Sequence, residues 1–345
     1  MTLSAPSSKD RHPVPIPTLA TERGGSPRIM RHRFKDIDHF TEQIQSLSRL
    51  QVTQLSLDQL ECDMWLAALE QVKFLFIKSS CPISVMGEKP RDAIVFSCLL
   101  EPDGPCLVSH GRRVSHHTLA GFDPDLEAKF VFPPQVHYVA LLINRGLLQH
   151  YLEIMGRPDL DQRFWASNYI YMPETIGAIK VYLQQVLHLI SHQPSLLQRH
   201  QLQTLLLEDC IPLLINAIPP ANQDRLQPPS HLPRSQLVKQ AEDYLLAHLD
   251  QPITLRDLCQ ALHTSQRPLF YGFQEVFGVS PMEYLKIQRL QRAHRCLQRA
   301  TAKHTTVMAI AQQYGFWSAG HFTRDYQKMF GERPSDTLKG TALHR

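Results

Sequence analysis

The sequence has 345 residues, which is enough for two domains of ordinary size, each with its own apolar core. Hydrophobic residues make up 43% and charged residues 20%, and no apolar run approaches the roughly 18 residues that cross a bilayer, so the composition excludes a membrane-spanning chain. The formal net charge of +4 lies wholly in the last third, because residues 235–345 hold 14 Lys and Arg against nine Asp and Glu, as expected for a surface that meets a polyanion.

Residues 1–33 are polar, contain five prolines and offer almost no large apolar side chains, so we expect a disordered tail. They include no apolar run of a secretory signal, which favours a cytoplasmic protein. The seven cysteines are scattered and form no Cys-x-x-Cys pair. This pattern favours reduced thiols over a disulfide framework or a zinc ribbon.

Short apolar runs separated by turn-forming residues follow, from about residue 50 to residue 142, and they predict a β-sandwich or barrel. The aromatic residues Trp65, Phe74, Phe76 and Phe96 are expected to fill its core. A cluster of histidines at 110, 116, 117 and 137 lacks the spacing of a metal site, so we expect no metal and no cofactor. The runs lie at 64–69, 72–77, 93–100 and 136–143.

Helical periodicity begins after Asn144, in segments 176–190 and 196–213, the second interrupted by Pro212. The two predict an antiparallel helix pair, whose apolar stripe suits either a homodimer seam or packing on the chain's own β-rich domain. Five prolines in residues 219–233 then indicate a linker. We therefore expect domains at 34–218 and 235–345, joined by residues 219–234.

The last third contains a repeat with an offset of 53 residues. Each copy has a Ser that begins a helix, an apolar residue at every fourth position, a Gly that ends the helix and a Pro that opens the next. A short amphipathic helix precedes each copy across a tight turn, at His263 and at Gly315, where a left-handed backbone is expected. Helix, turn and helix twice in register predict two helix-turn-helix units. The matching positions are Ser265, Leu269, Phe273, Phe277, Gly278 and Pro281, and Ser318, Phe322, Tyr326, Phe330, Gly331 and Pro334.

A helix from Pro281 to about Arg299 should connect the two units, and its length of about 30 Å is close to the roughly 34 Å between successive major-groove segments on one face of DNA. Helices 265–277 and 318–330 are therefore expected to read adjacent segments. The side chains opposite each buried stripe are the candidates for base contacts, and further polar and basic side chains for the DNA backbone, unless they only form a solvated surface. The base candidates are Arg267, Phe270, Tyr271, Gly320, Thr323 and Arg324; the backbone candidates are Ser265, Gln274, Lys286, Arg289, Arg292, Ser318 and Gln327.

Two motifs carry a resemblance to a known family, the helix end at Phe277-Gly-Val-Ser-Pro281 and the turn at Tyr314-Gly-Phe316. With these motifs, residues 253–338 resemble the DNA-binding domain of the AraC/XylS family of bacterial transcription regulators. The finer motifs at 257–263, 315–317, 325–327 and 334–338 look most like the ethanolamine operon regulator branch. Pro268 and Gly272 depart from the family pattern, and Gly272 is expected to weaken its helix.

The resemblance implies an activator that binds promoter DNA, acts with RNA polymerase, and carries an amino-terminal cupin-like barrel for a small-molecule effector or for dimerisation. Together with the patterns above it predicts an α+β protein of two domains that is not an enzyme and has no catalytic residues. Three alternatives are a cupin-type enzyme fused to a DNA-binding module, an effector-independent DNA-binding protein, and an architectural DNA-binding protein.

Overall fold

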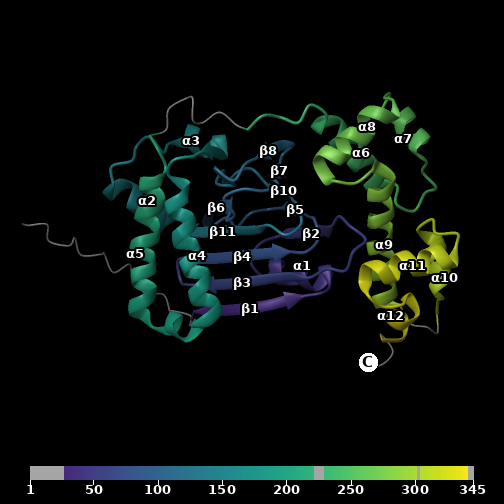
Figure 1. Cartoon of the computed structure of the whole chain (residues 1–345), viewed down its shortest axis with the longest axis horizontal. Helices are drawn as coiled ribbons and strands as arrows, with labels where there is room; N and C mark the ends of the chain where they lie inside the picture. The colour runs from purple at the N-terminus through teal and green to yellow at the C-terminus, as the bar shows by residue number, and fades with distance from the viewer. Residues whose placement is uncertain (1–26, 221–228, 301–303, 341–345) are drawn as a thin grey trace, which may run out of the picture.

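The computed structural model describes residues 27–220, 229–300 and 304–340, and it has a β-rich amino-terminal part and a helical carboxyl-terminal part (Figure 1). No helix among these residues is long and apolar enough to cross a membrane. The mixed fold expected from the sequence is confirmed at this level.

The strands form two antiparallel sheets, one of seven strands in the order β1-β3-β4-β11-β6-β9-β12 and one of five in the order β2-β5-β10-β7-β8. The predicted cupin-like barrel is not confirmed, because the described strands pair as two open sheets and do not close on themselves. The strands are β1 Arg28–Phe34, β2 Leu50–Gln54, β3 Cys62–Ala68, β4 Val72–Ser79, β5 Ile83–Gly87, β6 Ala93–Leu99, β7 Leu107–Ser109, β8 Arg112–Val114, β9 Thr118–Ala120, β10 Ala128–Phe132, β11 His137–Asn144 and β12 Tyr169–Tyr171.

The first strand corrects the predicted tail. Residues 1–26 lie outside the described residues, but Arg28–Phe34 forms β1 and pairs along its whole length with β3. Arg33 donates to Asp63 of β3 at 2.7 Å. A polar segment can form an edge strand because only one of its sides must be paired and most of its side chains stay in water.

The seven-stranded sheet is buried on both faces. Phe74 and Phe76 pack on one face with the helices that follow the strands, whereas Leu75 and Ile77 pack on the other face, among the side chains of the second sheet. Successive side chains of a strand point to opposite faces, so one short run supplies both cores. Trp65 and Phe96 join the helix-side core, so the four predicted core aromatics are buried, but between sheet and helices.

The helix pair is α4 Ile176–His192 and α5 His200–Ala217, with a 3₁₀ turn at Pro194–Gln198 between them. Its apolar stripe packs on the chain's own sheet, which answers the choice left open by the sequence. Pro212 does not interrupt the second helix as expected, because α5 continues through it. The other helices of this part are α1 Ile37–Gln45, α2 Arg145–Ile154 and α3 Gln162–Ser167.

The carboxyl-terminal part is all helical, and its core is centred on the apolar stripes of the repeat, including Phe273, Phe277, Phe322 and Tyr326. Its helices are α6 Ser235–Ala247, α7 Leu255–Ala261, α8 Gln266–Phe277, α9 Pro281–Arg299, α10 Val307–Gln313, α11 Ala319–Phe330 and α12 Pro334–Gly340.

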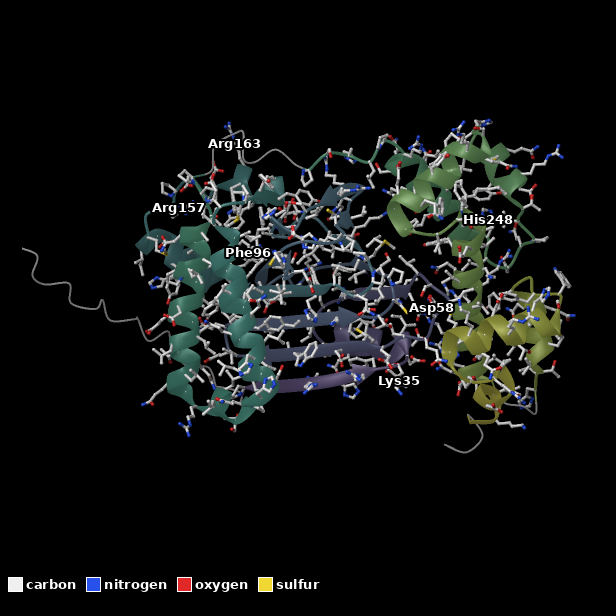
Figure 2. The ribbon with its side chains drawn as sticks, in the orientation of Figure 1. Lys35, Asp58, Phe96, Arg157, Arg163 and His248 are labelled. Carbon is white, nitrogen blue, oxygen red and sulfur yellow. The ribbon has the colours of Figure 1, made fainter. Side chains whose placement is uncertain are left out.

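The two parts are in direct contact. Leu55, directly after β2, and Val131 of β10 belong to the same apolar cluster as the carboxyl-terminal helices. Polar contacts surround this seam: Lys129 lies 3.4 Å from Glu242, and Asp58, labelled in Figure 2, lies 3.1 Å from Lys328. The amino-terminal part therefore touches α6, which precedes the repeat, and α11 of its second copy.

Candidate nucleic-acid interface

Two helix-turn-helix units are present as predicted, α7 with α8 and α10 with α11. His263 (φ 49°) and Gly315 (φ 77°) both adopt the left-handed backbone that the tight turns require. In the first unit Thr254 and Asp257 form a capping box that begins α7. The two turns are therefore built alike, although only one of them has glycine at the turn position.

The helix α9 joins the units without interruption. It has 19 residues, so it is about 28 Å long, and its first turn is capped by the Ser280 hydroxyl, which accepts from the Glu283 amide at 3.3 Å. Gly278 and Gly331 end α8 and α11 in left-handed conformations, as the repeat predicts.

The exposed face of α8 carries the first predicted set of DNA-contacting residues. Phe270 and Tyr271 are 46% and 45% exposed, while Leu269 on the opposite face is fully buried. The guanidinium groups of Arg234 and Arg267 each lie 5.7 Å from the centre of the Tyr271 ring. Arginine over an aromatic face is a favourable contact, so these two cations hold the ring in place. Arg267, Gln274 and Ser265 are exposed beside it.

Gly272 has a packing role that the sequence did not reveal. A Cβ atom at this position would lie 2.6 Å from Val238 Cγ2 and 3.1 Å from Arg234 Cβ. The missing side chain lets α6 pack closely on α8, which offsets the lower helix propensity that was expected to weaken α8. Pro268 lies in the first turn of α8, where its missing N–H has no partner in any helix.

On α11 the second predicted set lies opposite the buried residues Phe322, Tyr326 and Met329. Gly320, Arg324 and Gln327 are exposed, and Thr323 is half-buried. Ser318 caps the helix by accepting from the His321 amide at 3.4 Å. At the beginning of α11 lies an open cleft of about 570 Å³. The side chains that line it include Lys286, Trp317, Ser318, His321, Arg324 and Asp325.

The five cations of α9 do not form one basic surface. Lys286 lies 3.2 Å from Asp325, and Arg295 lies 2.7 Å from Asp38 of α1. Arg289 donates to the backbone carbonyls of Leu249 (2.9 Å) and Gln251. Its guanidinium also lies under the turn of the second unit, about 3.1 Å from where a Cβ of Gly315 would be. Arg292 and Arg299 are the members of this group that are exposed.

Sequence reasoning missed two residues of this surface. Trp317 is 72% exposed at the beginning of α11, and His321 is exposed one turn further on. Both residues directly follow the predicted turn at Gly315, at the start of the helix, and this position could have indicated that they lie on the same surface.

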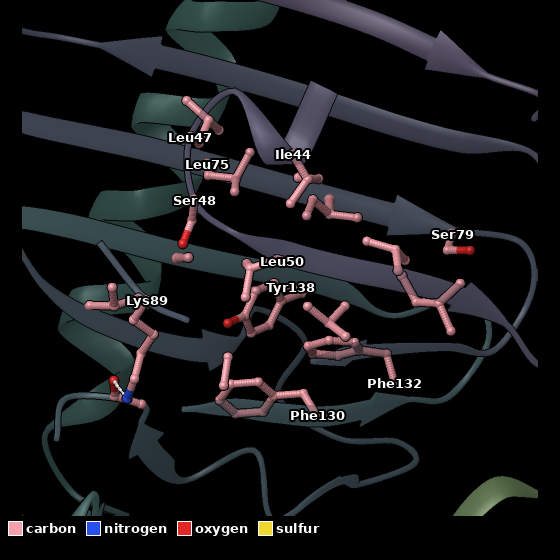
Figure 3. Close-up of a pocket in the computed structure, with 18 of the residues that line it drawn as sticks. Ile44, Leu47, Ser48, Leu50, Leu75, Ser79, Lys89, Phe130, Phe132 and Tyr138 are labelled. Atoms are coloured by element: carbon pink, nitrogen blue, oxygen red, sulfur yellow. Dashed lines mark hydrogen bonds between the residues drawn. The ribbon is translucent and has the colours of Figure 1, made fainter. Parts of the chain in front are cut away.

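A cavity of about 80 Å³ lies between the two sheets of the amino-terminal part (Figure 3). Its lining is apolar except for Ser48, Ser79, Tyr138 and Lys89, and it includes no carboxylate. Lys89 donates to the carbonyls of Gly121 and Asp123. Burial, only partly offset by nearby carboxylates, lowers the pKa of Lys89 to about 8.

Two histidines of the predicted cluster lie against Glu101. His116 bonds the Glu101 carbonyl at 2.8 Å, and His137 lies 3.2 Å from the Glu101 carboxylate. Within the described ranges, no group of three or more His, Cys, Asp or Glu could hold a metal ion. Cys98 is a free, buried thiol, and burial raises its pKa to about 12.

Comparisons with known proteins identify the carboxyl-terminal part. Residues 258–340 match the family model described as a helix-turn-helix domain. The chain is 36% identical over 155 residues to the "Probable thc operon regulatory protein" of Rhodococcus erythropolis, covering 44% of this chain and 46% of that protein. It is 31% identical over 102 residues to the "XylDLEGF operon transcriptional activator 2" of Pseudomonas putida, covering 30% of this chain and 63% of that protein.

A solved structure of a probable AraC family transcriptional regulator from Rhodopseudomonas palustris is 44% identical and covers 31% of this chain and 97% of that one, with a TM-score of 0.29. The chain thus matches less than two thirds of the length of the two curated relatives. Residues 258–340 thus match a helix-turn-helix domain, and the curated relatives are operon regulators; the ethanolamine regulator branch is not confirmed.

Proposed function

We infer that this protein is a DNA-binding transcription regulator of the AraC/XylS type, which binds duplex promoter DNA through both helix-turn-helix units. One observation carries this proposal: two complete units, joined by a single helix, each expose polar side chains opposite a buried apolar stripe, and α8 adds two exposed aromatic rings. One such unit is a common arrangement of two helices. Two units in register, joined by one helix, fit two successive major-groove segments on one face of DNA.

For base contacts we propose the exposed residues of α8 and α11. Arginine can bridge the O6 and N7 acceptors of guanine, and threonine or phenylalanine can contact the thymine methyl group. Arg324 and Phe270 are exposed, as base contacts require. The Arg267 guanidinium lies over the Tyr271 ring, so each side chain helps to hold the other in position. Thr323 and Gly320 would line the closest approach of α11 to the base edges.

For the DNA backbone we propose Arg292 and Lys286 on α9, Ser265 and Gln274 at the first unit, and Ser318 and Gln327 at the second. For Arg289 we now propose a different role. Two protein carbonyls already accept from its guanidinium, so we assign it to positioning the second unit rather than to a phosphate.

An effector is the use we propose for the cavity between the sheets. Its apolar lining suits an apolar molecule. An amino alcohol such as ethanolamine suits it poorly, because an ammonium ion buried there would have no carboxylate to pair with.

A homodimer, RNA polymerase as partner and a cytoplasmic location stay predictions. The stripe at 176–190, which suited either a dimer seam or the chain's own β-rich domain, packs within the chain's own core.

The test is selection of binding sites from randomised duplex DNA by the purified full chain, followed by footprinting. Two protected major-groove segments about one helical turn apart are expected. Absence of any preferred sequence, with binding that depends on salt alone, would instead support an architectural protein.

A further inference from the structure

Trp317 has no role in the interface described so far, although it is the most exposed large hydrophobic side chain among the described residues, at 72%. The next are Ile154 at 57% and Val181 at 55%. A tryptophan left in water gives up the large stabilisation that its burial would provide. A side chain of this kind at the edge of a binding surface calls for a partner.

The local backbone explains why the indole points outward. Gly315 turns the chain in a left-handed conformation, and the Phe316 amide donates to the Ala311 carbonyl at 3.0 Å. The Phe316 ring then packs on Phe322, with 5.0 Å between ring centres. Phe316 is partly buried against the apolar core, and Trp317 is left at the surface.

The surroundings of Trp317 are suited to an anionic partner. It lines the open cleft at the beginning of α11 together with Lys286, His321 and Arg324, and Asp325 is the single carboxylate there, already paired with Lys286 at 3.2 Å. The first amides of a helix also attract negative charge. An apolar ring beside cations matches a nucleic-acid backbone, in which apolar sugars alternate with phosphates.

The first unit has no equivalent residue. The position 53 residues before Trp317 is Thr264, which is half-buried and not aromatic. The first unit instead exposes Phe270 and Tyr271 on the face of its recognition helix. The indole is therefore a feature of the second unit alone, placed before the N-cap Ser318 and outside the face that carries the base candidates.

We propose that Trp317 is a DNA-contact residue whose indole packs on a deoxyribose of the backbone, next to the bases that α11 faces. This inference rests on the proposed DNA-binding function. The contact is apolar and independent of sequence, so it adds affinity and holds α11 in register without selecting a base.

The first experiment measures the affinity of full-length protein for its selected site and for single-base variants of that site. Trp317→Ala should weaken binding about tenfold to every sequence alike, as for a buried aromatic contact. The slope of affinity against salt should not change, because the indole carries no charge. Trp317→Phe should retain most of the affinity. Tyr171→Ala, at a 51% exposed aromatic residue of the amino-terminal part, is the matched control.

The second experiment observes the indole itself. Trp65 is buried and Trp165 is half-buried, so Trp317 should account for most of the fluorescence that acrylamide quenches. Addition of the selected DNA should protect it, and the protection should be absent in Trp317→Phe. If Trp317 served folding alone, adding the selected DNA would not change the acrylamide quenching of the parent protein.

The outcomes separate the two proposals. If the parent protein binds no DNA sequence preferentially, the proposed function fails. If the parent binds its site while Trp317→Ala binds equally well and the indole stays open to acrylamide, the inference about Trp317 is wrong. If Trp317→Ala changes the preference at one base pair, the residue reads a base and the backbone assignment is wrong.

Discussion

Arg295 and Asp38 are 257 positions apart in the sequence, and the Arg295 Nε donates to Asp38 Oδ1 at 2.7 Å. The contact joins α1 of the amino-terminal part to α9, the helix between the two helix-turn-helix units. Directly beside it, His294 Nε2 lies 3.2 Å from Asp36 Oδ2, and His294 Nδ1 lies 2.6 Å from the Tyr326 hydroxyl of α11. The amino-terminal part is thus linked to α11 through the side chains of His294 and Tyr326.

We expect the Asp38–Arg295 ion pair to stabilise the packing of the two parts. The variants that test this are Asp38→Asn, Arg295→Gln and the double variant. Both side chains are partly buried, at 18% and 25% exposure, so we expect a coupling of about 0.5–3 kcal/mol in a double-mutant cycle on denaturant unfolding. The exposed pair Arg49 and Glu88 serves as the control and should couple weakly. Additive effects of the two single changes would show that the contact contributes nothing.

Acid should weaken the same region through Asp36. Burial raises the pKa of its carboxyl, but hydrogen bonds from His294 and the His39 amide outweigh burial and lower the pKa to about 2. A lowered folded pKa means stability that is present above about pH 4 and is lost as the pH falls toward 2. Asp36→Asn should remove this part of the acid sensitivity between pH 4 and 2, measured as thermal midpoints. An identical pH profile in the variant would contradict the assignment.

Gly272→Ala should destabilise the protein, the reverse of what a helix interior usually shows. The added methyl would meet Val238 and Arg234, and overpacking of this kind costs about 1–3 kcal/mol. Gly320→Ala is the matched control, because nothing lies within 4 Å of its Cβ position, and it should stabilise α11 by up to about 1 kcal/mol. Val238→Ala should restore much of the loss in Gly272→Ala, since it opens the space that the methyl needs.

Arg324→Ala should relax base preference. If the guanidinium contacts guanine, its loss costs about 1–3 kcal/mol on the preferred sequence and little on a sequence without that base. Binding to a library of single-base variants gives the measurement. If Arg324→Ala lost the same affinity for every DNA variant, Arg324 would contact the DNA backbone and not a base.

Arg292→Ala and Arg289→Ala should differ, although both remove a cation from α9. Loss of an exposed phosphate contact lowers the salt slope of binding by about one, and this is expected for Arg292. Arg289→Ala should lower thermal stability, because two carbonyls lose their donor, while the salt slope stays as in the parent. The reverse result would exchange the two roles.

Local patterns in the sequence were sufficient to predict the helices and turns of the two helix-turn-helix units, but not α6. Apolar spacing, the glycines that end α8 and α11, and left-handed positions at His263 and Gly315 act over a few residues, and the structure has all of them; of the two predicted serine caps, Ser318 forms its cap hydrogen bond and Ser265 does not. The repeat then placed equivalent side chains of α8 and α11 on equivalent faces. The role of each of these side chains toward DNA remains a prediction.

Contacts between distant segments decided the rest. Which cations of α9 stay exposed depends on Asp38, some 257 positions away, and on the carbonyls of Leu249 and Gln251. Whether a polar segment at Arg28–Phe34 becomes a strand depends on the open edge of β3, and whether Gly272 weakens or supports α8 depends on Val238. The sequence alone determined the helices of the repeat, since periodicity and turn positions are local. Only the tertiary structure decided which segments pair and pack together, because ion pairs and close packing depend on distances between residues that the order along the chain does not specify.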